Sequence, residues 1–166
     1  MSEHVFHLTA TAPQLQTPYG ARTRVSRENF PILQRLSLAR LTIEPGGFRE
    51  PHWHANAHEL GYCLHGEVLV TVFGDANEHE SFTISEGEMF FVPSGALHAL
   101  ENIGDSQVET IVVFSDEEPQ DFGFSGSIGM FTANVMGNAW GLPSPSWRRS
   151  AIRPTRTPPC ARSARS

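Results

Sequence analysis

Three side chains of types that bind metals stand close together at His52, His54 and Glu59, and a fourth follows at His98. Side chains at positions i and i+2 of an extended strand leave the same face, so His52 and His54 can direct two imidazoles at one ion. Glu59 follows after a bend, and His98 arrives from a third segment. Three neutral imidazoles and one carboxylate suit a divalent first-row metal, and an octahedral ion would keep two positions for substrate or dioxygen. The spacing therefore predicts a metal site.

The segments around these residues have the pattern of short strands separated by turns. Glu44–Gly47 and Ser85–Gly87 contain the residues that turns require. Strands at intervals of about 8–12 residues are typical of an all-β sandwich or barrel. We expect strands over residues 36–43, 60–64, 67–73, 81–84, 89–92 and 109–114.

Length and composition are those of one ordinary domain. The chain has 166 residues, of which 39% are hydrophobic, enough for a single packed core. No apolar run approaches the length of about 20 residues that crosses a membrane, so we expect no membrane span. The first residues have neither a basic region nor a long apolar stretch, and the two cysteines, Cys63 and Cys160, form no disulfide framework. These features favour a protein of the reducing cytoplasm.

Charge is distributed unevenly along the chain. All 18 acidic residues lie at or before Asp121, whereas six of the 12 basic residues follow Trp147, and there is no lysine. An acidic body disfavours nucleic acid as a partner. Residues 143–166 are rich in Pro, Arg and Ser with few large apolar side chains, so we expect a disordered basic tail.

Two motifs with matching spacing resemble those of the cupin superfamily. The first is a glycine, five residues, His-x-His, four residues, Glu, six residues and Gly; the second is a glycine, five residues, Pro-x-Gly, two residues, His, three residues and Asn. The positions that match are Gly46, His52, His54, Glu59 and Gly66 in the first motif and Gly87, Pro93, Gly95, His98 and Asn102 in the second. Together the two motifs are far more specific than an isolated His-x-His.

This resemblance implies an all-β fold, the double-stranded β-helix or jelly-roll barrel, with the four ligands inside it. We expect an N-terminal arm over 1–35, the barrel core over 36–116, a lid and helical segment over 117–142, and the tail over 143–166. The helical prediction covers 127–140, where Ile128, Phe131, Val135 and Ala139 recur at helical spacing. We expect this helix to pack on the barrel mouth. Cupins of this kind commonly pair through their sheets, which implies a homo-oligomer.

The residues around the first motif are similar to oxalate decarboxylases. Arg49-Glu50-Pro51-His52-Trp53-His54 resembles the Arg-Glu-Leu-His-Trp-His segment of that family. The resemblance implies that Arg49 pairs with the substrate carboxylate beside the metal. A guanidinium is a permanently charged planar fork that matches a carboxylate, which supports this role independently. The alternative is a surface Arg49 paired with Glu44 or Glu50.

The resemblance also implies the cofactors and the reaction. We expect Mn(II), with Fe(II), Ni(II) or Zn(II) as other occupants, dioxygen as co-substrate or cofactor, and oxalate or a similar small carboxylate as substrate. Family decarboxylases use a lid glutamate in a Ser-Glu-Asn-Ser-like sequence, but residues 121–127 have a glycine where that acid is expected. Glu117, Glu118 and Asp121 are the nearby acids, so decarboxylase and oxidase outcomes both stay open. An iron dioxygenase, an isomerase, or a cupin that binds metal or carboxylate without turnover are further alternatives.

Overall fold

The computed structural model describes residues 2–76, 78–139, 141 and 161–162. A short 3₁₀ helix, η1, spans Leu8–Ala10. Strands make up most of the rest: β1 Leu15–Thr17, β2 Gly20–Val25, β3 Ser37–Ile43, β4 Gly47–Trp53, β5 Glu59–His65, β6 Glu67–Phe73, β7 His79–Ser85, β8 Met89–Val92, β9 His98–Asn102, β10 Val108–Phe114, β11 Phe122–Gly123 and β12 Ala161–Arg162. Two helices, α1 Phe124–Gly129 and α2 Ala133–Ala139, follow β11.

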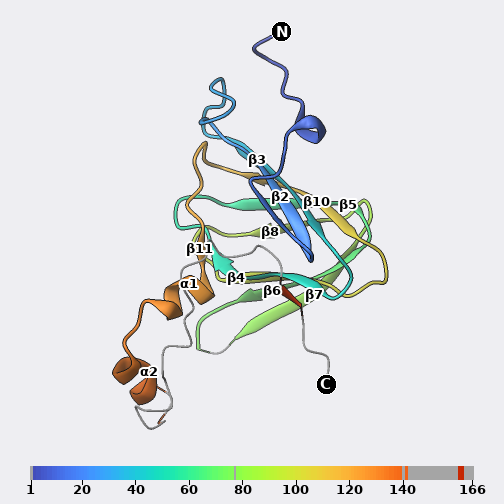
Figure 1. The fold of residues 1–166 in the computed structure, drawn as a ribbon. Coiled ribbons are helices and arrows are strands. Elements are labelled where there is room, and N and C mark those ends of the chain that lie inside the picture. The colour runs from blue at the N-terminus through green and yellow to red at the C-terminus, as the bar shows by residue number, and fades with distance from the viewer. Residues whose placement is uncertain (1, 77, 140, 142–160, 163–166) are drawn as a thin grey trace.

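The strands form two antiparallel sheets that face each other (Figure 1). The first sheet has the order β1-β2-β3-β10-β5-β8, and the second has β11-β4-β9-β6-β7, with β12 also paired to β4. Four consecutive strands of the first sheet, β3-β10-β5-β8, therefore face four of the second, β4-β9-β6-β7. This is the arrangement of a jelly roll. The all-β double-stranded β-helix expected from the sequence is confirmed.

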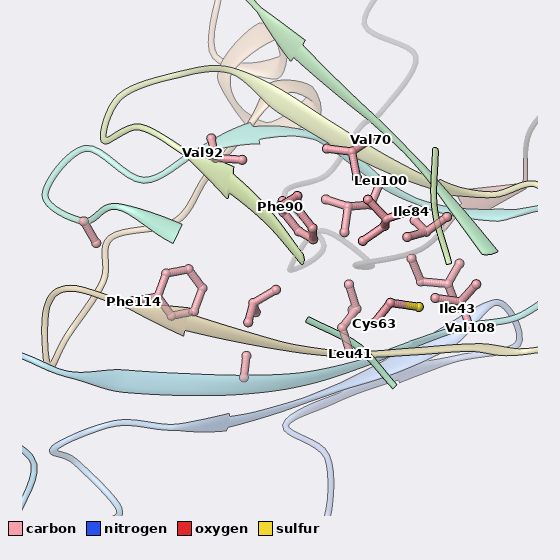
Figure 2. Packing of buried hydrophobic residues seen from close by; sticks show 14 residues of the cluster. Leu41, Ile43, Cys63, Val70, Ile84, Phe90, Val92, Leu100, Val108 and Phe114 are labelled. Atoms are coloured by element: carbon pink, nitrogen blue, oxygen red, sulfur yellow. The ribbon is translucent and has the colours of Figure 1, made fainter. Parts of the chain in front are cut away.

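A single apolar cluster fills the space between the two sheets (Figure 2). Alternate residues of β10 point inward, and Val108, Val112 and Phe114 contribute to the cluster from that strand. Cys63 is buried in the same core and is a free thiol. The other members labelled in Figure 2 are Leu41, Ile43, Val70, Ile84, Phe90, Val92 and Leu100. This core holds the strands that carry the candidate site.

The six strands expected from the sequence are present with ends that differ by at most two residues. The expectation of an arm over residues 1–35 needs correction, because β1 and β2 within that segment belong to the first sheet. Six consecutive residues of β2 pair with β3, from Gly20 opposite Ile43 to Val25 opposite Leu38. The polar alternation of β2, with Arg22 and Arg24, concealed a strand whose other face is buried at Thr23 and Val25.

The helical prediction over 127–140 is also corrected. Two short helices replace one, because Thr132 interrupts the chain: its hydroxyl accepts a hydrogen bond from Val135 N and so caps α2. The expected apolar face does not form, since Phe131 and Val135 are exposed and the buried residues of α2 are Met136 and Gly137. Helix α1 contacts β4 and β11, whereas α2 lies away from the barrel in Figure 1.

The basic tail expected over 143–166 lies outside the described residues apart from Ala161 and Arg162. These two residues pair with Phe48 and Gly47 of β4 as strand β12. Among the residues that the structure describes, no helix has the length and apolar character needed to span a membrane.

Candidate metal centre

The two sheets bring the four predicted metal-binding side chains together inside the barrel. His52 on β4 and His98 on β9 are paired across neighbouring strands, and His54 follows directly after β4. Glu59 begins β5 on the opposite sheet. One potential ligand atom from each of the four lies within 4.8 Å of the others, and all four residues are buried. By contrast, His4, His7, His58, His65 and His79 are all exposed.

Backbone carbonyls set the protonation of the three imidazoles. The Nδ1 atoms of His52, His54 and His98 lie 2.8–2.9 Å from the carbonyl oxygens of Glu50, Gln120 and Ala96. A carbonyl only accepts, so each Nδ1 carries the proton and each Nε2 keeps a free lone pair. This is the tautomer that metal-binding histidines adopt when a second group holds their other nitrogen.

The remaining atoms converge in a way that fits a bound cation. Glu59 Oε2 lies 3.2 Å from His54 Nε2 and 3.3 Å from His98 Nε2. His54 Nε2 is buried without a hydrogen-bond partner. Lone pairs of two imidazoles and a carboxylate repel at this distance unless a cation is shared among them. The donor set suits a first-row divalent metal.

Burial and neighbouring charges favour the metal-binding protonation states. Burial, together with the positive charge of Arg49, lowers the pKa of His52 well below its ordinary value, so this imidazole stays neutral. Burial alone would raise the pKa of Glu59, but the neighbouring imidazoles of His54 and His98 outweigh burial and hold that pKa below its usual range. A neutral imidazole and an ionised carboxylate are the forms that coordinate metal.

A bulge in β4 brings Arg49 to the same side as the histidines. In a regular strand, residues three apart point to opposite faces. The pairing of β4 with β9 shifts between Arg49, opposite Leu100, and His52, opposite His98, so β4 has one extra residue here. Pro51 lies at this irregularity and has no N–H to contribute to the sheet. As a result Arg49, Glu50, His52 and His54 are all buried.

Arg49 is paired with Asp121 rather than lying on the surface. Its Nη2 donates to Asp121 Oδ1 at 2.5 Å, and its Nη1 lies 3.8 Å from Glu50 Oε1. The surface pairing with Glu44 considered above is therefore wrong, and Glu50 is a longer-range partner. Arg22 of β2 also donates to Asp121. The sequence did not predict Arg22 as a site residue, because residues 1–35 were expected to form an arm. The only pattern that indicated a strand there was the alternation Arg22-Thr23-Arg24.

The other two acids considered as proton sources are held by the N-terminal strands and loops. Glu117 accepts from Arg35 N and pairs with Arg27. Glu118 pairs with Arg24 and accepts from Glu28 N. Of the three acids, only Asp121 pairs with an arginine beside the metal ligands.

Two cavities share Arg22 and Arg49. The inner cavity, about 30 Å³, is lined by both arginines, by His52, His54 and Glu59, and by apolar residues such as Leu41 and Phe114. The outer cavity, about 430 Å³, is lined by the same two arginines together with Gln14, Leu15, Arg24, Glu28, Glu50, Asp121 and Gly123. The candidate metal centre thus adjoins a larger chamber.

Comparison with known proteins places this geometry in a family. The Cupin family model matches residues 6–146. The chain is 33% identical over 102 residues to an oxalate decarboxylase of Bacillus subtilis (strain 168), a match that covers 61% of this chain and 26% of that protein. It is 36% identical over 111 residues to germin-like protein 1-2 of Oryza sativa subsp. japonica, covering 65% of this chain and 50% of that protein. It is 33% identical over 116 residues to oxalate oxidase GF-2.8 of Triticum aestivum, covering 66% and 52%. The chain thus spans between about a quarter and half the length of these curated relatives.

Solved structures agree on the fold. A structure of oxalate decarboxylase from Bacillus subtilis matches with a TM-score of 0.86 and 24% identity, over 96% of this chain and 41% of that one. Another solved structure of that enzyme, with the same similarity, concerns its Mn(II) centres. The jelly-roll sheets, the two spaced motifs and the family match over most of the chain agree, and the chain belongs to the cupin family.

Proposed function

We propose that this chain is a metal-dependent enzyme that acts on a small dicarboxylate, with oxalate as the first candidate and Mn(II) as the metal. The observation that carries the proposal is the buried set of His52, His54, Glu59 and His98 with the guanidinium of Arg49 beside it. Relatives named as oxalate decarboxylases and oxalate oxidases support the substrate, and the Mn(II) centres of a structural neighbour support the metal.

In this proposal the four side chains hold the metal, and Arg49 recognises the substrate. When bound, Mn(II) would supply positions for oxalate and dioxygen and accept or donate single electrons. Arg49 binds a carboxylate through its planar fork, and its burial strengthens that interaction because water competes less. The apolar walls at Leu41, Leu100 and Phe114 exclude further water from the site.

Two balanced reactions are open to oxalate at such a site. Decarboxylation consumes one proton and yields formate and carbon dioxide; oxidation consumes dioxygen and two protons and yields two carbon dioxide and hydrogen peroxide. Burial alone would raise the pKa of Asp121, but Arg49 and Arg22 outweigh it and hold that pKa at about 2, so this carboxylate carries no proton near neutral pH. An ionised Asp121 supports the oxidase outcome, because a decarboxylase must protonate carbon.

Product analysis tests the reaction. Manganese-loaded protein is incubated with oxalate and oxygen, and formate, carbon dioxide and peroxide are measured. Peroxide with carbon dioxide is the expected result. Formate with carbon dioxide would show that another acid delivers the proton. Without any product, oxalate would be rejected as substrate, and the site would belong to an iron dioxygenase, an isomerase or a non-catalytic cupin.

The role of Arg49 is tested separately from turnover. We expect Arg49→Ala to keep its metal but to bind oxalate about 10- to 100-fold more weakly, because a charge-assisted hydrogen bond is lost. Metal content and calorimetric titration with oxalate measure the two effects. Arg40→Ala is the matched control, because Arg40 pairs with Glu109 and lines none of the described cavities. Unchanged affinity in Arg49→Ala would contradict the assigned role.

A further inference from the structure

Two guanidinium groups from different sheets meet on one carboxylate beside the metal centre. Arg22 extends from β2 and Arg49 from β4, and they donate to different oxygens of Asp121. The side chain of Asp121 is only 20% exposed although its residue as a whole is exposed, so the carboxylate is turned inward. Two cations held this close repel unless an anion lies between them. The pair is therefore built to hold a carboxylate, and Asp121 now supplies it.

The sizes of the two cavities indicate that the present arrangement is closed. The inner cavity of about 30 Å³ has room for about two water molecules, which is less than a molecule with two carboxylates requires. The outer cavity of about 430 Å³ has the size of a small-molecule site, about 300–1,000 Å³. Arg22 and Arg49 line both cavities, so a ligand in the outer chamber meets this pair before it reaches the metal ligands.

Three residues that line the outer chamber carry buried polar atoms without hydrogen-bond partners. Arg22 Nε, Arg24 Nε and Glu50 Oε1 are buried without a hydrogen-bond partner, and all three residues line this chamber. Buried polar atoms without partners are costly, and a ligand can supply what they lack. Glu50 Oε1 is an acceptor, but the two unpartnered guanidinium N–H groups are donors, and they favour a ligand that offers oxygen acceptors, such as an organic acid.

We propose that Arg22 is a second carboxylate-binding residue and that Asp121 is an internal anion, which a small dicarboxylate displaces to reach the metal centre. The inference rests on the proposed function for the identity of the inner site and deepens it by naming what opens that site. One carboxylate of the ligand replaces Asp121 between Arg22 and Arg49, and the other enters the enlarged inner cavity. Substrate selection then depends on competition with Asp121, not on Arg49 alone.

Binding measurements test the proposal without turnover. Oxalate and malonate are titrated by calorimetry into metal-loaded protein. Asp121→Asn keeps the shape but removes the competing charge, so we expect about tenfold tighter binding of both ligands. Arg22→Gln should weaken binding about 10- to 100-fold, because a charge-assisted bond is lost. Arg22→Lys should restore only part of that loss, since lysine lacks the planar fork.

Glu117→Gln is the matched control, because this acid lies in the same loop as Asp121 but pairs with Arg27 and lines none of the described cavities. Its affinities should equal those of the parent protein. If Asp121→Asn does not fold, Arg22→Gln and hydrogen exchange of the parent protein decide. Malonate should then speed the hydrogen exchange of the backbone amides at residues 120–122, because displacing Asp121 releases that loop. Slower or unchanged exchange, together with unchanged malonate affinity in Arg22→Gln, would overturn the proposal.

The outcomes separate this inference from the proposed function. Turnover of oxalate with unchanged affinities in Asp121→Asn and Arg22→Gln would leave the proposed function standing and overturn the inference. Shifted malonate affinities in both variants without any product from oxalate would support the inference and contradict the proposed function.

Discussion

At the scale of single residues, backbone carbonyls orient the imidazoles of the candidate metal ligands. Each of the three buried imidazoles donates its Nδ1 proton to a carbonyl, which leaves three Nε2 lone pairs around Glu59 Oε2. His54 depends on Gln120 for this hydrogen bond, so the loop that carries Asp121 also orients a candidate metal ligand. Groups behind the ligands affect metal affinity through such orientation.

The negative charge of Glu59 should be needed for metal binding. Glu59→Gln keeps the size of the side chain but removes the negative charge, so we expect metal affinity to fall by at least about 100-fold. Metal content after dialysis against a competing chelator measures the loss. His65→Ala is the control, because His65 is exposed and pairs with Glu86 outside the barrel. Equal metal retention in Glu59→Gln and the parent protein would rule out Glu59 as a ligand.

At the scale of elements, the bulge in β4 and the packing of β5 against β8 position the site. The bulge lets Arg49 share a face with His52 although three positions separate them. Strand β5 begins with Glu59 and pairs with β8, with Gly61 directly opposite Phe90. Phe90 is one of the core residues in Figure 2. The orientation of β5 therefore depends on the absence of a side chain at Gly61.

Gly61→Ala tests this packing. An added Cβ would lie 2.0 Å from Cε1 of the buried Phe90 ring, so we expect a loss of about 1–3 kcal/mol in the free energy of unfolding. Urea denaturation measures it. Gly74→Ala is the control, since its Cβ would meet only an ordinary contact of 3.5 Å with Glu78. Gly61→Ala combined with Phe90→Leu should lose less than the sum of the two single changes, because the smaller side chain relieves the clash; additive losses would mean that the ring is not the cause.

At the scale of the whole molecule, Asp121 ties the two sheets together at the site. Its carboxylate pairs with Arg22 of the first sheet and Arg49 of the second. Phe122 follows Asp121 in the chain and stacks on Trp53 of β4, with ring centroids 5.4 Å apart. This contact holds the loop that carries Asp121 against the barrel. The carboxylate of Asp121 therefore affects both ligand binding and the stability of the fold. Displacing it opens the site and removes a link between the two sheets.

The pH dependence of stability follows from this link. The pKa of Asp121 is lowered from its ordinary 3.8 to about 2 in the folded protein. A carboxylate with a lowered pKa stabilises the folded state at pH values above the unfolded-state pKa. Its contribution to the free energy of unfolding, about 2 kcal/mol, is lost as the pH falls from about 4 towards 2. The difference in unfolding free energy between parent protein and Asp121→Asn should therefore shrink over that range. Denaturation at pH 6 and at pH 3 measures it; a difference that does not change with pH would show that Asp121 gains nothing from the arginines.

The sequence by itself predicted six strands of an all-β fold and grouped His52, His54, Glu59 and His98 as candidate metal ligands, and its resemblance to cupins implied the jelly-roll class. These conclusions depend on local alternation and on the spacing of two motifs, both of which can be read along the chain. Strands β1, β2 and β9 were not predicted, because their many polar residues do not indicate which face of each strand is buried. Only the tertiary structure showed that Arg22 reaches the site, since its neighbours belong to another sheet. It also showed that a bulge turns Arg49 inward and that Asp121 occupies both guanidiniums. Register shifts and contacts between sheets depend on pairing partners far away in the chain, so no local pattern encodes them.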